Sequence, residues 1–252
     1  MSLYLSRILL NPRSRRAMGE LLHPYEMHRT LMRAFPAAEG AENGNPREKF
    51  GVLFRAEPSE EIGEPVKILV QSLCEPDWSF LDAIEGYLDQ RTGAPYEYRD
   101  IMPSISKIKK GGRFAFRLRA NPTKRIGAGE DPMKGKRVEL FRYEEQLQWL
   151  VRKSGEREKG TPGGFRLLKE PGGNDTYSVK ITREGKKTGR RERSGKTSAT
   201  THLSVLYEGL LEVSDEKGFF QTVIKGIGPA KAFGFGLLSL SPEKTFERAF
   251  SP

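Results

Sequence analysis

His23–Arg33 reads H-P-Y-E-M-H-R-T-L-M-R and holds two of the three histidines in the 252-residue chain. Pro24 stands where a first helical turn tolerates proline, because the missing N–H would have had no partner within the helix. Apolar residues then recur at helical spacing, at Met27, Leu31, Ala34 and Phe35. The stretch therefore predicts an amphipathic helix with one buried face, around which the first part of the chain folds.

His28 lies on the shoulder of that apolar face, and Tyr25 lies about 60° further round a helix that turns by about 100° per residue. Because the two residues are three apart, a ring nitrogen and a phenol can face the same place. They form a candidate acid–base pair. The alternative is a half-buried helix whose histidine only packs, and this stretch alone leaves both interpretations open. His23, just before the helix, either caps it or contacts a ligand.

The chain is strongly basic, with 43 Lys and Arg against 33 Asp and Glu and a net charge of +10. A charge of this size favours a polyanionic partner, most often nucleic acid, with an anionic membrane surface as the competing interpretation. No apolar run approaches the length of a membrane span. The length suits one large domain or two of ordinary size.

The single cysteine, Cys74, cannot form an internal disulfide and is compatible with a reducing cytoplasm. One cysteine and three scattered histidines form no metal-ligand cluster. We therefore expect metal-free chemistry without a cofactor, with a metal held by carboxylates as the alternative.

The first half predicts the element order β-α-β-β-α-β. The expected strands are 3–10, 50–57, 66–72 and 96–102, and the expected helices are 24–35 and 77–88, with loops at 11–20 and 37–48. Asp77 is the candidate cap of the second helix. This order is that of the ferredoxin-like arrangement, in which two helices cover one face of a four-stranded antiparallel sheet.

The second half predicts the same order again, with its middle hairpin extended. The expected strands are 113–121, 165–169, 177–182, 202–213 and one closing 226–240, and the expected helices are 143–153 and 215–225. We therefore expect an α+β protein of two tandem ferredoxin-like (RRM-like) domains, 1–106 and 107–252, with a basic cleft between them.

Lys107–Arg125 contains eight Lys or Arg and no acidic residue. Within it, R-F-A-F-R-L-R-A-N alternates with a period of two, so Arg113, Arg117 and Arg119 share one face of a strand. These unopposed charges predict a positive row that contacts successive phosphates. The alternative is an ordinary solvated sheet face.

Arg183–Lys196 carries seven basic residues against two acidic ones, and its three glycines disfavour a helix. It predicts a flexible basic hairpin arm that orders on a polyanion, lying in a groove of structured RNA or along its backbone. The alternative is a disordered basic loop without a role.

Gly226–Gly236 reads G-I-G-P-A-K-A-F-G-F-G, with glycines at 226, 228, 234 and 236. Bare backbone permits close approach of another chain and leaves N–H groups that can donate to phosphate, and Lys231 adds a charge. Lys231 also replaces the third glycine of a dinucleotide fingerprint, which excludes that motif. The alternative is a tight loop before the last strand.

These blocks together resemble the CasE family, the endoribonuclease subunit of the type I-E CRISPR surveillance complex (Cascade). The resemblance lies in four blocks, which are Leu10–Ser14, His23–Leu31, Phe116–Arg125 and Gly226–Leu238. It implies a tandem ferredoxin-like fold and cleavage of CRISPR precursor RNA at the base of each repeat hairpin. It further implies a protein that keeps the crRNA hairpin bound and assembles with other Cascade subunits. We expect the protein to work in the cytoplasm, with no membrane partner.

The resemblance also implies roles for individual residues. By position, His28 and Tyr25 match the catalytic histidine and tyrosine of the family. Matches to RNA-backbone positions are Arg117, Arg119, Asn121, Lys124 and Arg125, while Lys231 and Gly226, Gly228, Gly234 and Gly236 match its glycine-rich loop. Arg190, Arg191 and Arg193 match the family's basic hairpin by place only. Arg33 stands where some relatives have another basic residue.

A metal-free RNA cut can use the 2′-hydroxyl next to the scissile phosphate, giving a 2′,3′-cyclic phosphate and a 5′-hydroxyl. Histidine suits the proton transfers because its ordinary pKa lies near neutrality, and Arg29 or Arg33 could stabilise charge on the phosphorane. Which of His28 and Tyr25 is the acid and which the base stays open. The alternative function is a non-catalytic RNA-binding subunit of a ribonucleoprotein complex.

Overall fold

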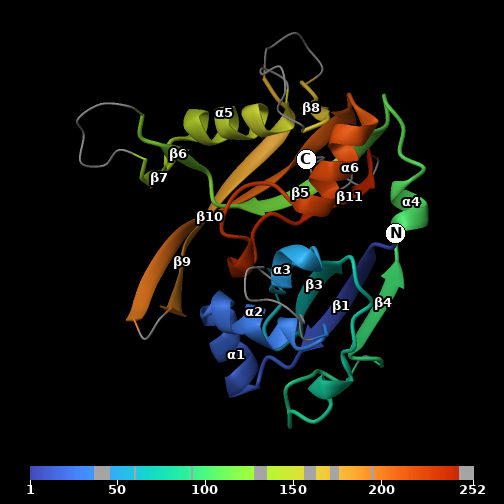
Figure 1. Ribbon diagram of the computed structural model, residues 1–252, viewed down its shortest axis with the longest axis vertical. Coiled ribbons are helices and arrows are strands. Elements are labelled where there is room, and N and C mark those ends of the chain that lie inside the picture. Colours follow the sequence, from blue (N-terminus) through green and yellow to red (C-terminus); the bar gives the residue numbers. More distant parts are fainter. Residues whose placement is uncertain are drawn as a thin grey trace. The chain divides into compact units, whose positions relative to one another are not determined.

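The computed structural model describes residues 1–36, 46–59, 61–91, 93–127, 135–155, 163–170, 176–193 and 196–243, without the side chains of 46, 190–193 and 196–199 (Figure 1). The chain forms two compact units. The first contains Met1–Lys107, Lys187–Thr201 and Lys231–Leu237, and the second contains Ile108–Lys186, His202–Ala230 and Leu238–Pro252.

The first unit is built on a four-stranded antiparallel sheet. Its strands are β1 (Tyr4–Leu10), β2 (Leu53–Glu57), β3 (Val66–Ser72) and β4 (Tyr96–Asp100), in the order β2-β3-β1-β4. The central pair runs from Tyr4 opposite Ser72 to Leu10 opposite Val66. The four strands expected from the sequence are confirmed to within a few residues.

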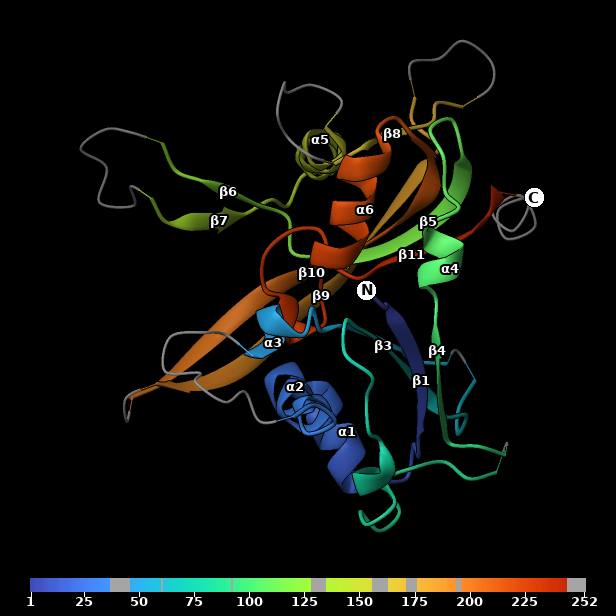
Figure 2. The same ribbon diagram turned by 45° about the vertical axis from the view of Figure 1, so that its right-hand side comes forward.

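Two helices, α1 (Arg15–Leu22) and α2 (Pro24–Met32), cover one face of this sheet (Figure 2). The predicted apolar face of α2 is confirmed, since Met27, Leu31, Ala34 and Phe35 are all buried in the core with strand residues such as Ile68.

The expected loop at 11–20 is wrong in its second half, where α1 begins. Ser14 caps this helix, because its Oγ accepts a hydrogen bond from the Ala17 N–H at 3.3 Å. Serine is among the strongest cap residues, and that signal precedes the helix in the sequence. The expected loop at 37–48 likewise ends in one helical turn, α3 (Pro46–Lys49).

The expected helix at 77–88 is also wrong. Only a short 3₁₀ turn forms, η1 (Ser79–Leu81), although the apolar residues Trp78, Leu81 and Leu88 are buried as the pattern requires. Asp77 does accept from the Ser79 N–H at 3.0 Å. The end of the segment instead pairs with β1, as Leu88 forms a β-bridge to Leu10 and Asp89 N–H donates to the Leu9 carbonyl at 2.9 Å. These strand contacts replace the backbone bonds that a helix would have made. After β4 the chain makes a further turn, α4 (Met102–Ile105).

A five-stranded sheet in the order β11-β5-β10-β8, with β9 paired to β10, lies mainly in the second unit, while the Lys187–Thr201 part of β9 and β10 belongs to the first. The strands of this sheet are β5 (Arg113–Ala120), β8 (Phe165–Leu167), β9 (Val179–Arg193), β10 (Lys196–Val213) and β11 (Leu238–Pro242). Helices α5 (Tyr143–Ser154) and α6 (Glu216–Lys225) pack on it through Trp149 against Tyr207 and Phe219 against Phe165. These strands and helices confirm the predicted order.

Two parts of this half differ from the expectation. The sequence does not reveal the hairpin of β6 (Thr123–Arg125) and β7 (Arg137–Glu139). Strands β9 and β10 are much longer than the expected 177–182 and 202–213, and they carry the basic segment as a paired ribbon (Figure 2). We call residues 183–193 and 196–201 of this ribbon the basic arm. The side chains of Arg190, Arg191 and Arg193 lie outside the described residues.

Across the described part of the chain, no helix is long and apolar enough to span a lipid bilayer.

Candidate functional site

Helix α2 carries both candidate catalytic side chains. It begins after His23, whose side chain makes no capping hydrogen bond, and Pro24 occupies its first turn. Of the two roles considered for His23, side-chain capping is therefore not observed. Burial of Met27 and Leu31 fixes the rotation of the helix and so the directions in which Tyr25 and His28 project.

The imidazole of His28 is half-buried and stacks on Phe54 of β2, with ring centroids 6.3 Å apart and an interplanar angle of 10°. Its Nδ1 is fully buried and has no hydrogen-bond partner among the described residues. Buried polar atoms in folded proteins are almost always paired, so an unpartnered ring nitrogen is a feature that a catalytic or ligand-binding role explains.

Burial, followed by the positive charge of Arg47, lowers the pKa of His28 from 6.5 to about 4. Both causes act in the same direction, because each disfavours the imidazolium. The ring is therefore neutral at pH 7 in the free protein and can accept a proton.

Tyr25 lies beside His28, with ring centroids 6.0 Å apart and an interplanar angle of 46°. The spacing of three along the helix brings the two rings together as predicted. The Tyr25 ring also packs on Phe233, at 5.8 Å and 32°.

Phe233 comes from the glycine-rich segment, which reaches this helix through the 3₁₀ turn η2 (Lys231–Phe233). Lys231 therefore belongs to the same unit as His28. A hydrogen bond holds the end of the segment to β2, because the buried Arg55 donates from Nη1 to the Leu237 carbonyl at 3.0 Å.

Close packing explains two of the four glycines. Gly234 has φ +80°, and a Cβ there would lie 3.2 Å from Cε2 of Phe54. Gly228 has φ +86°, and its Cβ would lie 3.0 Å from Cζ2 of Trp149. Gly226 and Gly236 also have positive φ values, 71° and 94°. These glycines are therefore in close contact with aromatic rings of the same chain, and the expected approach of RNA to their backbone stays a prediction.

The sequence suggests Arg29 and Arg33 as stabilisers of a phosphate, and the structure adds a third arginine of this unit. Arg29 forms an ion pair with Glu26 at 3.1 Å, and the guanidinium of Arg33 lies 4.5 Å from the centre of the Phe80 ring. Sequence reasoning missed the third, Arg47 of α3, whose side chain is only 11% exposed and pairs with Glu48 at 2.9 Å. Its segment was expected to be a loop, and no local pattern indicated that its charge would act on His28.

The predicted row of unopposed charges on β5 is wrong. Arg113 pairs with Glu212 at 3.1 Å and Arg117 with Glu208 at 3.5 Å. The cause is the antiparallel register, which sets β10 residues 212 and 208 directly opposite 113 and 117. The acids that seemed absent are supplied by the neighbouring strand.

Arg119 is held most firmly of all. Its side chain is 4% exposed and binds both carboxylate oxygens of Glu184, at 2.6 and 2.7 Å, while Ser204 donates to the same carboxylate at 2.7 Å. A phosphate contact by Arg119 would have to displace this carboxylate.

The remaining expected RNA contacts lie around β6. Asn121 is buried and donates to the Leu203 carbonyl at 3.0 Å, so its amide serves the fold. Lys124 pairs with Glu145 at 3.0 Å on the surface, and Arg125 is exposed.

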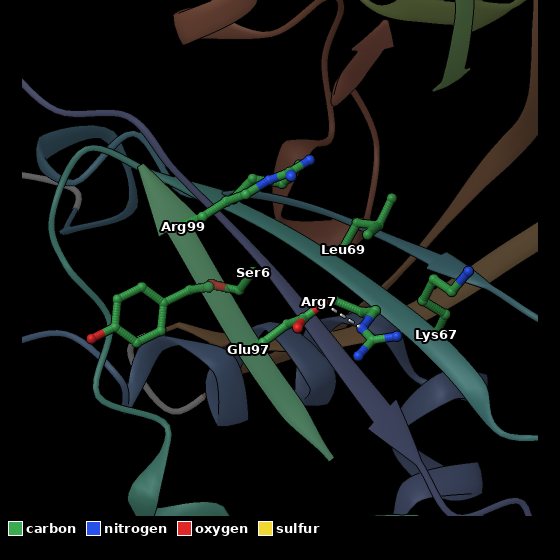
Figure 3. Close-up of a pocket in the computed structure, with 8 residues that line it drawn as sticks. Ser6, Arg7, Lys67, Leu69, Glu97 and Arg99 are labelled. Atoms are coloured by element: carbon green, nitrogen blue, oxygen red, sulfur yellow. Dashed lines mark ion pairs between the residues drawn. The ribbon is translucent and has the colours of Figure 1, made fainter. Parts of the chain in front are cut away.

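A pocket of about 410 Å³ lies on strands β1, β3 and β4, and its lining includes Leu5, Arg7, Lys67, Leu69, Glu97 and Arg99 (Figure 3). Arg7 and Glu97 form an ion pair at 3.0 Å. None of the candidate catalytic residues lines this pocket.

Among the described residues, no group of three or more His, Cys, Asp or Glu side chains is placed to hold a metal ion.

Comparison with known proteins gives consistent matches. A family model described as "CRISPR associated protein" matches residues 3–242. The CRISPR-associated endoribonuclease Cse3 of Thermus thermophilus is 41% identical over 242 residues, covering 95% of this chain and 100% of that protein.

Two solved structures extend the likeness to the fold. Thermus thermophilus Cse3 bound to an RNA representing a pre-cleavage complex is 38% identical, with a TM-score of 0.70 over 96% of this chain and 100% of that one. The CRISPR-associated protein Cas6e from Escherichia coli K-12 is 26% identical, with a TM-score of 0.57 over 95% and 99%.

Proposed function

Because the chain belongs to the Cse3/CasE (Cas6e) family of CRISPR-associated endoribonucleases, we propose that it binds CRISPR repeat RNA and cuts the precursor at the base of each hairpin stem. We propose further that it retains the crRNA hairpin and works in the cytoplasm as a subunit of a Cascade-type complex. The observation that carries the cleavage proposal is the juxtaposition of Tyr25 with His28, whose buried Nδ1 has no partner in the described chain.

The reaction needs no metal. The 2′-oxygen loses its proton and forms a bond to phosphorus, the bond from phosphorus to the 5′-oxygen breaks, and that oxygen takes up a proton. The products are a 2′,3′-cyclic phosphate and a 5′-hydroxyl. A positioned acid or base contributes about 10²–10⁴-fold to such a step.

His28 transfers protons in this scheme, and Tyr25 orients or deprotonates the 2′-hydroxyl. The pKa of about 4 keeps His28 neutral before RNA binds. A bound phosphate brings negative charge, which raises the pKa of the imidazole and allows the protonated ring to serve the leaving 5′-oxygen.

Arg47 is a further candidate to stabilise the phosphorane, because its positive charge is one of the two causes that lower the pKa of His28. Arg29, Arg33 and Arg47 already contact Glu26, the Phe80 ring and Glu48 respectively, so a phosphate would compete with these contacts at each of the three.

RNA binding is assigned to the basic arm with Arg190, Arg191 and Arg193, to Lys231, and to Arg117, Lys124 and Arg125. The two sheets have the same strand order when each sheet's strands are numbered along the chain. The first is β2-β3-β1-β4, and the second, read as β8-β10-β5-β11 without β9, is also second-third-first-fourth. This shared order supports tandem ferredoxin-like domains at 1–106 and 107–252.

The test is cleavage of a repeat-hairpin RNA in EDTA by the wild-type protein and by His28→Ala. We expect the wild type to cut and the variant to lose at least about 100-fold in rate while still binding. Full activity of the variant would contradict the assignment of His28. A 2′-deoxynucleotide at the cut site should block cutting and leave binding intact, and persistent cutting would exclude attack by the 2′-hydroxyl.

The half-buried stacking of His28 on Phe54 favours a second candidate, an RNA-binding subunit without catalysis. Tight binding of the hairpin with no cleavage by the wild type would select it.

A further inference from the structure

The ring of Phe233 lies between the basic arm and Tyr25. Phe233 is 8% exposed, and on one side its ring packs on Tyr25 at 5.8 Å. On the other side it meets the bare backbone of Gly189 in β9, where an added Cβ would overlap Cε1 and lie 3.1 Å from Cδ1. Only a residue without a side chain lets the arm rest directly on this ring.

Cross-strand contacts hold the arm together next to Gly189. Thr188 and Thr201 join β9 to β10 through a hydroxyl contact of 3.3 Å, and Thr200 donates to the Gly189 carbonyl at 3.4 Å. Lys187 lies 5.7 Å from the centre of the Phe235 ring, which is fully buried. The arm therefore contacts the glycine-rich segment at two aromatic residues, Phe233 and Phe235.

The glycine-rich segment also contacts His28 indirectly, through Phe54. Gly234 packs on Phe54, and Phe54 stacks on His28. A shift of this segment would therefore disturb both rings of the pair, with the most direct path running from Gly189 through Phe233 to Tyr25.

We propose that Phe233 is a positioning residue that couples the basic arm to Tyr25, so that RNA seated on the arm fixes the phenol in its cleaving geometry. This inference rests on the proposed endoribonuclease function. Its consequence is that a change at Gly189 alters the rate of cutting more than the affinity for RNA. Placement errors of about 1 Å at a reacting group can cost on the order of 100-fold in rate.

The decisive variant is Gly189→Ala, because a methyl group there must displace the Phe233 ring. We expect the single-turnover rate constant to fall at least about tenfold. The dissociation constant for a hairpin with a 2′-deoxynucleotide at the cut site should change less than about threefold, which a general loss of structure would not produce. The matched control is Gly19→Ala in α1, where an added Cβ meets nothing within 4 Å and activity should be unchanged.

The second variant, Phe233→Leu, removes the ring that the added methyl group would meet. Phe233→Leu shortens the side chain, so it should slow cutting by itself through lost packing on Tyr25. Adding Gly189→Ala to Phe233→Leu should then cost little more, because the methyl group no longer meets a ring. Additive losses in the double variant would overturn the coupling.

The outcomes separate this inference from the proposed function. If the wild type cuts and Gly189→Ala cuts equally fast, or loses rate only in proportion to binding, the coupling alone is overturned. If the wild type binds the hairpin without cutting it, both fall.

Discussion

His28 combines two environments that usually occur apart. One face of its ring is packed like a core residue against Phe54, while its Nδ1 is a buried polar atom without a partner in the described chain. A purely structural histidine would be expected to satisfy that nitrogen, since an unmade hydrogen bond in the interior costs on the order of 1–3 kcal/mol. The ring is therefore packed against Phe54 on one face, while its buried Nδ1 has no hydrogen bond within the described residues.

Arg47 tunes this histidine, and Arg47→Gln tests how. Removing the charge should raise the pKa of His28 above about 4, but not to 6.5, because burial is the larger cause and remains. An NMR titration of the His28 ring protons would measure the shift. Cleavage should also slow by on the order of tenfold as the phosphorane loses a cation. Arg47→Lys, which keeps the charge, should leave the pKa low, and an unchanged pKa in Arg47→Gln would show that the charge does not reach the ring.

The sign of the accompanying stability change follows from linkage. A histidine whose pKa is lower in the folded than in the unfolded protein stabilises the fold fully above the unfolded value, 6.5, and less as pH falls toward about 4. The wild type should therefore lose stability across this window, and Arg47→Gln should lose less.

At the scale of elements, charge on β5 is decided by its neighbours. The exposed pairs of Arg113 and Arg117 with β10 carboxylates are of the kind that contribute little to stability, about 0–1 kcal/mol each. The buried pair of Arg119 with Glu184 of β9 is different, because both charges have lost much of their water and depend on each other. Residue 184 of the arm is therefore joined to β5 by a buried ion pair, and removing one partner should lower the free energy of unfolding substantially.

Glu184→Gln should destabilise the protein by about 2–4 kcal/mol, because it leaves the guanidinium of Arg119 buried beside a neutral amide. The matched control is Glu208→Gln, which removes the carboxylate facing the more exposed Arg117 and should cost less than about 1 kcal/mol. Urea melts of the two variants measure the difference. Equal losses would mean that solvent reaches the Arg119 pair.

Hydrophobic periodicity predicted the elements well, as α2 and β5 illustrate. Both have patterns set by local spacing, and both formed where the spacing placed them. The expected helix at 77–88 failed because Leu88 pairs with Leu10, a contact 78 residues away that no window of sequence contains. The partners of the β5 arginines lie 65 to 99 residues away, so their neutralisation was equally invisible. The pair Tyr25 and His28 was found because it is local, and Arg47 was missed because its relation to His28 is not.

At the scale of the whole molecule, the net charge is +10, but many of the Lys and Arg side chains form ion pairs with carboxylates. Pairing of this kind restricts which cations are available to RNA, so a count of Lys and Arg overstates the number of phosphate contacts. The salt dependence of binding counts the contacts directly, because each phosphate neutralised releases condensed counterions.

We therefore expect the affinity for a 2′-deoxy-blocked repeat hairpin to fall about 10³-fold or more between 50 and 200 mM salt, as about six or more phosphate contacts would require. Arg125→Gln, at an exposed position of β6, should weaken binding and reduce the slope of log K against log salt by about one. Lys67→Gln supplies the control, since this cation lines the pocket of Figure 3, outside the proposed RNA-binding set, and should leave the slope unchanged. Equal reductions by both variants would mean that RNA samples the whole basic surface, and the protein would then be a general polyanion binder whose specificity has to come from other subunits.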